Sequence, residues 1–111
     1  MIEDKIQAQA VEWFTNKFCL KHHTPRCCIF SVPNGGLRNK IEAIKLVATG
    51  MRKGVSDIII IRLNEVLFIE FKAPVVGKWS DEQKEFKYIV NNLGFKYLLF
   101  DNIDKFKEYF N

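Results

Sequence analysis

The chain has 111 residues, of which 48% are hydrophobic and 27% charged, with a net charge of +4. This length fits one domain spanning residues 1–111, and the composition excludes disordered, collagen-like and low-complexity chains. No apolar run approaches the ~18 residues that a membrane span needs. Charged residues follow Met1 almost at once, so we expect no signal peptide, and the odd number of three cysteines favours a reduced, cytoplasmic protein.

The first half of the chain predicts a helix, a strand and a second helix. Apolar residues recur with a period near 3.6 over residues 3–20, which predicts an amphipathic helix. Residues 27–32 predict a short buried strand in which Cys28 points into the core. The Pro-Asn-Gly-Gly run at 33–36 predicts a turn, and residues 38–49 predict the second helix.

The second half predicts a hairpin, a capped helix, a strand and a terminal helix. The hairpin joins residues 57–63 to residues 66–72 through an Asn64-Glu65 loop. Ser80 and Gln83 form a capping-box pattern that begins a helix ending at Gly94. Residues 95–100 predict a strand and residues 103–110 a final helix, which gives the order αβ(α)ββαβα and an α/β fold.

Three charged residues in the hairpin do not fit an ordinary apolar sheet. With a two-residue loop at 64–65, Asp57 lies directly across from Lys72 and diagonally from Glu70, because strand side chains alternate between faces. One interpretation is an edge-strand ion pair. The other is a metal site, since burying two carboxylates beside one lysine is costly unless a cation balances the charge.

A hard divalent cation, Mg²⁺ or Mn²⁺, suits these groups because it prefers oxygen ligands. Asp57, Glu70 and the Phe71 carbonyl are the candidate ligands. Lys72 would stand beside a metal-bound water and help to orient or deprotonate it.

The order of several motifs carries a family resemblance. Asp57 followed by Glu70-Phe71-Lys72 has the D…ExK pattern, and around it lie PNGGLR at 33–38, GMRKGVSD at 50–57, IEFKAP at 69–74 and WSDEQK at 79–84. Together they closely resemble the stand-alone bacteriophage VRR-NUC domain of the PD-(D/E)xK nuclease superfamily, over nearly the whole chain. Ser56 stands where the superfamily name has proline.

The resemblance implies a restriction-endonuclease-like core, a mixed four-stranded sheet flanked by helices. It also implies an intracellular, phage-encoded, Mg²⁺- or Mn²⁺-dependent endonuclease acting on DNA, with neither a membrane nor a small-molecule substrate. Asp57, Glu70 and Lys72 then resemble the catalytic residues, Glu3 a further metal ligand and Gln83 a further site residue. Structural alternatives stay open: Glu3 also suits a first helical turn, with Glu12 as the substitute acid if the helix is rotated, and Gln83 also suits a cap.

Basic side chains are concentrated between residues 17 and 53, where eight of them accompany one acid, Glu42. This surplus predicts a polyanion-facing surface, and the alternative is a solvated basic surface with no partner. The candidate DNA contacts are Asn34, Arg38, Lys40, Arg52 and Lys53.

The relatives that this chain resembles are homodimeric resolvases of four-way (Holliday) junctions. Ten Phe, two Trp and three Tyr are many for so short a chain, which favours a self-complementary apolar face on the first and last helices, with Trp13, Phe14, Phe106, Tyr109 and Phe110 as candidates. The alternatives are a flap or non-specific nuclease, a non-catalytic DNA-binding subunit, or a purely structural domain. A zinc site at Cys19, His22, His23, Cys27 and Cys28 competes weakly, because the spacing lacks separated ligand pairs.

Overall fold

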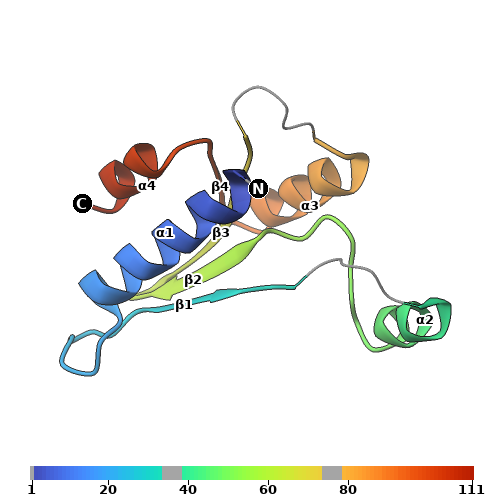
Figure 1. Cartoon of the computed structure of the whole chain (residues 1–111), viewed down its shortest axis with the longest axis horizontal. Coiled ribbons are helices and arrows are strands. Elements are labelled where there is room, and N and C mark those ends of the chain that lie inside the picture. The colour runs from blue at the N-terminus through green and yellow to red at the C-terminus, as the bar shows by residue number, and fades with distance from the viewer. Residues whose placement is uncertain (1, 34–38, 74–78) are drawn as a thin grey trace.

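A computed structural model describes residues 2–33, 39–73 and 79–111, which form a mixed four-stranded sheet with helices on both faces (Figure 1). The elements are α1 (Ile2–Phe18), β1 (Cys28–Ser31), α2 (Lys40–Ala48), β2 (Ile58–Arg62), β3 (Glu65–Phe71), α3 (Asp81–Asn92), β4 (Lys96–Phe100) and α4 (Ile103–Phe110). The predicted class and order are confirmed, and the predicted boundaries differ from these by a residue or two. Most of the predicted turn at 33–36 lies outside the described residues. None of the described helices is long and apolar enough to cross a membrane.

The strands lie in the order β1-β2-β3-β4, antiparallel except for the parallel pair β3 and β4. The parallel pair follows from α3, which crosses over between these two strands. Because β1 is the first strand in this order, it is an edge strand. The prediction that it is buried is wrong: none of its four residues is buried, and Cys28 is exposed.

The hairpin register differs from the predicted one. Arg62 pairs with Glu65, so the loop is Leu63-Asn64, and Asn64 takes the positive φ of 58° that a tight hairpin requires. Glu65 stays in the strand because its carboxylate bonds Arg62 Nε at 2.7 Å and Lys96 Nζ at 2.8 Å. Continued by one pair beyond Ile58 and Ile69, this register sets Asp57 opposite Glu70 rather than opposite Lys72.

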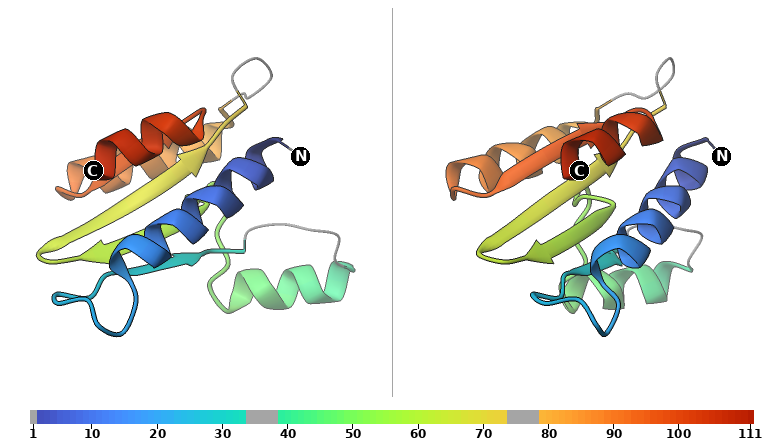
Figure 2. Two further views of the ribbon diagram at one scale, coloured as in Figure 1. Left: turned by 60° about the vertical axis from the view of Figure 1, so that its left-hand side comes forward. Right: turned by 90° about the vertical axis from the view of Figure 1, so that its left-hand side faces the viewer.

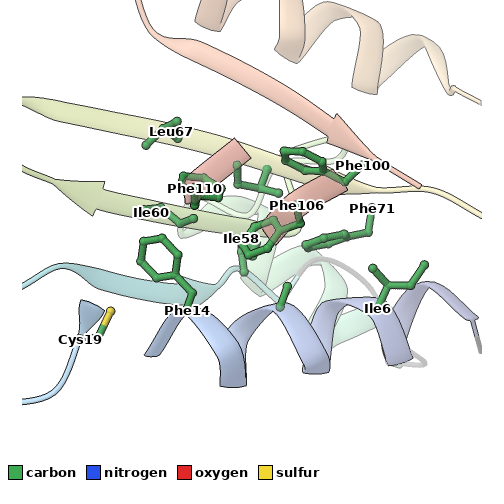
Figure 3. Close-up of a cluster of buried hydrophobic side chains, with 12 residues drawn as sticks. Ile6, Phe14, Cys19, Ile58, Ile60, Leu67, Phe71, Phe100, Phe106 and Phe110 are labelled. Atoms are coloured by element: carbon green, nitrogen blue, oxygen red, sulfur yellow. The ribbon is translucent and has the colours of Figure 1, made fainter. Parts of the chain in front are cut away.

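The core lies between the sheet and the helices α1 and α4, which pack against each other on one face (Figure 3). Phe14, Phe106 and Phe110 are buried there, and the ring centroids of Phe14 and Phe110 lie 5.2 Å apart. These three side chains therefore cannot form the self-complementary face that the sequence predicted. The aromatic excess is absorbed here by ring-on-ring packing inside one chain.

The helix α3 covers part of the opposite face of the sheet. Its Phe86 ring contacts Phe68 at 5.6 Å and Tyr97 at 6.1 Å between centroids. The cover stops short of the β1 edge, where Phe30 remains 41% exposed and Ile61 45%. The even-numbered side chains of β3, Glu70 among them, face α3.

The helix α2 stands apart from the sheet in all three views (Figures 1 and 2). None of its side chains is buried, and Ile41, Ile44 and Val47 are 60–79% exposed. Asn39 caps it by accepting a hydrogen bond from the Glu42 backbone N–H at 2.8 Å. In the sequence α2 lies between Pro33, which follows β1, and Gly54, which precedes β2, and both of these residues line the cleft described next.

Candidate active site

A cleft of about 520 Å³ opens where β2 begins, β3 ends and α3 begins. Its polar lining is supplied by side chains from five separate stretches of the chain. The lining residues are Gln7, Ser31, Val32, Pro33, Gly54, Val55, Asp57, Glu70, Ser80 and Gln83.

Asp57 and Glu70 are the two carboxylates of the cleft. Asp57 immediately precedes β2, and its Oδ2 accepts a hydrogen bond from the Phe71 backbone N–H at 2.7 Å. Glu70 lies in β3 and is only 3% exposed. The two carboxyl groups also hydrogen-bond to each other, so the predicted pair of acids is brought together.

Two side chains hold Glu70 from the α3 side. The Tyr97 hydroxyl donates to Glu70 Oε2 at 3.1 Å, and the Gln83 amide nitrogen donates to Oε1 at 3.3 Å. Both oxygens of this buried carboxyl therefore have partners, as a buried polar group requires.

The electrostatics of the pair show a shortage of positive charge. Burial first, and then the charge of Asp57, raises the pKa of the Glu70 carboxyl to about 8. Burial likewise raises the pKa of Asp57, against the opposing effect of the Phe71 hydrogen bond. The Tyr97 hydroxyl has a raised pKa because it is buried beside Glu70, so it stays protonated as a donor. At neutral pH these shifts favour a pair that holds one proton between its two carboxyl groups.

Lys72 and Glu3 complete the charged surroundings. The charge of Lys72 lowers the pKa of both carboxyls, although not enough to cancel the burial. Glu3, in the first turn of α1, accepts a hydrogen bond from the Ala73 backbone N–H at 3.0 Å and lies close enough to raise the pKa of Asp57. Gln7, one helical turn later, also lines the cleft, whereas Glu12 lines a separate hollow beside α4.

Gln83 acts both as a cap and as a site contact, two roles that sequence reasoning treats as alternatives. Its Oε1 accepts from the Ser80 backbone N–H at 2.9 Å, while its own backbone N–H donates to Ser80 Oγ at 3.1 Å. The amide nitrogen is left over and reaches Glu70. A primary amide has separate donor and acceptor ends, so one side chain serves both purposes.

Gly54 fixes the approach of α3 to the cleft. It has a φ of +84°, and a Cβ there would lie 2.4 Å from the Glu82 carbonyl carbon and 2.7 Å from the Gln83 backbone nitrogen. Only glycine permits both this backbone angle and this contact. Sequence reasoning anticipates the turn at Gly54, but the contact with α3 becomes visible only in three dimensions.

Tyr97 is the site residue that the sequence analysis missed. It lies in an ordinary apolar strand pattern, and only the parallel pairing of β4 with β3 brings its hydroxyl to Glu70. No local motif marks it. The strand alternation is its one signal. Tyr97 lies two residues before Leu99, so the two side chains share one face of β4, and Leu99 pairs with Glu70.

The candidate DNA contacts all lie between Pro33 and Gly54 in the sequence. Lys40 is exposed at the start of α2, Lys53 is exposed, and Arg52 lies 3.7 Å from the Glu85 carboxylate of α3. Asn34 and Arg38 lie outside the described residues.

The geometry leaves little support for zinc. Across residues 2–33, 39–73 and 79–111, no group of three or more His, Cys, Asp and Glu side chains is arranged to hold a metal ion. Cys19 is buried, Cys28 is exposed, and His23 Nδ1 accepts from the Leu20 backbone N–H at 2.9 Å.

Comparison with known proteins supports the fold. The chain is similar to a solved structure titled "VRR_NUC domain protein", with a TM-score of 0.74 and 23% sequence identity over 99% of this chain and 85% of that one. The sequence matches no protein-family model and no curated protein. The mixed sheet with flanking helices is thus the fold of a VRR-NUC domain.

Proposed function

We propose that the protein is a Mg²⁺- or Mn²⁺-dependent endonuclease that hydrolyses DNA phosphodiester bonds. The observation that carries this proposal is the pair Asp57 and Glu70, two carboxyls that hydrogen-bond to each other in an open cleft. The fold shared with a VRR_NUC domain protein supports the same conclusion.

The donor chemistry of the cleft fits a hard divalent ion. Such an ion is commonly held in nucleotide-processing sites by one or two carboxylates together with water and substrate phosphate. Asp57 and Glu70 would hold it, with the Phe71 carbonyl and Glu3 as the further candidates. When bound, the ion would polarise the scissile phosphate and lower the pKa of a coordinated water.

The chain's own groups have distinct roles in this mechanism. Tyr97 and Gln83 fix the two oxygens of Glu70, one of the two carboxyl groups that would hold the ion. The Phe71 N–H fixes Asp57 in the same way. Lys72 orients the attacking water and offsets the charge that develops on the phosphate.

Binding of the duplex would rest on the basic surface around α2. Lys40, Arg52 and Lys53, with Asn34 and Arg38, would contact phosphates and position the backbone without reading the bases. The chain carries no obvious base-reading module, so selection by DNA shape is favoured, and we propose a four-way junction as the substrate.

We also propose that the protein acts as a homodimer, because a symmetric junction needs two active sites. The apolar face of α2 replaces the face predicted on α1 and α4, where Phe14, Phe106 and Phe110 are buried. A nine-residue helix with no buried side chain is far shorter than helices that are stable alone, so packing against another surface would stabilise it. A second copy of the chain is the partner that the function requires on this face of α2. Pro33 and Gly54, which lie before and after α2 in the sequence, both line the cleft.

The experiment that tests the proposed function compares wild-type protein with Asp57→Ala, Glu70→Ala and Lys72→Ala. Each variant should lose cleavage of labelled DNA while keeping its far-UV circular dichroism and its DNA affinity. A folded variant with near wild-type activity would remove that residue from the mechanism.

A further inference from the structure

The outer surface of α3 carries a second hollow, of about 420 Å³, beside the catalytic cleft. It is lined by Trp79, Lys84, Lys87, Tyr88 and Asn91. The last four are spaced i, i+3, i+4 and i+7, so they share one helix face. The apolar core does not account for them, since Phe86 and Val90 provide the buried face of this helix.

Aromatic surface and positive charge are combined in this hollow. Tyr88 is 69% exposed, and Lys87 Nζ lies 5.2 Å from the centre of the Trp79 ring. Within the described part of the chain neither Lys84 nor Lys87 forms an ion pair, while the neighbouring acid Glu85 contacts Arg52. Tyr88 is exposed and Trp79 is half-buried, and rings flanked by lysines are the features with which proteins bind single-stranded nucleic acid: bases stack on the rings and lysines contact phosphates.

The hollow adjoins the catalytic cleft at the start of α3. Trp79 immediately precedes Ser80, which lines the cleft, and its ring packs on Tyr97 with centroids 5.8 Å apart. The hydroxyl of that same Tyr97 bonds Glu70. From Gln83 to Asn91 α3 rises ~12 Å, about the length of three or four stacked nucleotides at ~3.4 Å each.

We propose that this hollow binds unpaired DNA bases that adjoin the cleaved phosphate. One base would stack on the exposed Tyr88 ring next to Trp79, with Asn91 offering an amide for hydrogen bonds, and Lys84 and Lys87 would contact the flanking phosphates. This inference rests on the proposed nuclease function and deepens it, because it gives the enzyme a way to prefer DNA with locally opened strands over plain duplex.

Intrinsic fluorescence offers a direct test, because the chain has two tryptophans and only Trp79 lies in the hollow. The variant Trp13→Phe leaves Trp79 as the sole tryptophan, and Trp79→Phe leaves Trp13, which packs between Phe18 and Phe106. Titration with a dT12 oligonucleotide in EDTA should quench the first variant and leave the second nearly unchanged.

A matched tyrosine pair tests the stacking by affinity. Tyr88→Ala should weaken dT12 binding, measured by anisotropy, by roughly 5- to 150-fold, the equivalent of ~1–3 kcal/mol for one stacked base. Tyr109→Ala removes an exposed tyrosine from α4 and should change it little. The double variant Lys84→Ala/Lys87→Ala should lower the slope of log K against log salt by ~1.4.

Three results would overturn the inference. They are Trp79 fluorescence that is not quenched at saturating oligonucleotide, no binding of the oligonucleotide at all, and equal weakening of binding by the two tyrosine variants. These measurements need no cleavage. Cleavage without quenching would refute the hollow alone, whereas quenching without cleavage of any DNA would refute the nuclease function and leave the hollow in place.

Discussion

Replacing Glu70 with glutamine should stabilise the metal-free protein at high pH and not at low pH. In the folded protein the pKa of Glu70 is raised to about 8, against 4.5 for an ordinary glutamic acid. The folded state therefore holds a proton that the unfolded state releases. Stability is greatest below pH 4.5 and falls as the pH rises through about 8.

The size of the effect follows from that difference. At ~1.36 kcal/mol for each pKa unit, the full penalty above pH 8 is about 5 kcal/mol. The carboxyl borders an open cleft, where solvent screens part of the charge, so we expect roughly 2–3 kcal/mol. For a domain of this length that is about 8–12 °C in melting temperature. A glutamine can still accept from Tyr97 and donate to Asp57, and it loses only the hydrogen bond from the Gln83 amide nitrogen.

The assay is thermal unfolding of wild-type protein and Glu70→Gln in EDTA between pH 5 and 9. The two curves should nearly coincide at pH 5, separate as the pH rises to about 8 and run parallel beyond it, with the variant higher. Adding Mg²⁺ at pH 8 should raise the wild-type melting temperature and not that of the variant. Equal melting temperatures at pH 5 and at pH 9 would refute the electrostatic account of the pair.

Three further predictions follow from the same structure. Mg²⁺ or Mn²⁺ at 100 times its dissociation constant should stabilise the wild-type protein by ~2.7 kcal/mol, and an unchanged melting temperature under conditions that support cleavage would contradict the metal site. In urea unfolding, Gly54→Ala should destabilise the protein by at least ~2 kcal/mol more than Gly50→Ala, and it should also impair cleavage. Both glycines have a positive φ, but only Gly54 contacts α3. Equal losses of stability would exclude that contact. Light scattering should report a dimer for the wild-type chain and a monomer for Ile44→Asp, and a monomeric wild-type chain at micromolar concentration would remove the dimer.

The fold was largely predictable from local patterns. Hydrophobic periodicity and caps at Ser80 and Asn102 mark the helices, and β-branched runs mark the central strands. The hairpin register was less predictable, because the ion pairs of Glu65 with Arg62 and Lys96 decide which residues form the loop. Lys96 belongs to a strand distant in sequence, so no local rule includes it.

The candidate site was likewise predictable only in part. The carboxylates of Asp57 and Glu70 share a face in either hairpin register, because a displacement of two positions preserves the alternation. Which residue lies opposite Asp57 depended on the register, and it was predicted wrongly. Tyr97 required the parallel pairing of β3 and β4, which no single segment encodes.

The burial of aromatic residues was also beyond sequence reasoning. Counting rings indicates an apolar excess, but it does not show which of them pack together. Phe14, Phe106 and Phe110 fill the core, while the exposed apolar face belongs to α2, whose spacing looks like that of any amphipathic helix.

The most direct test of the central claim is cleavage of labelled DNA by purified protein, with Asp57→Ala as the control for contaminating nuclease. A four-way junction, a flap and a linear duplex are each incubated with Mg²⁺, Mn²⁺ or EDTA. We predict cleavage with either metal, a preference for the junction, and none in EDTA. Folded protein that cuts none of the three with either metal, or that cuts equally well in EDTA, would contradict the proposed function.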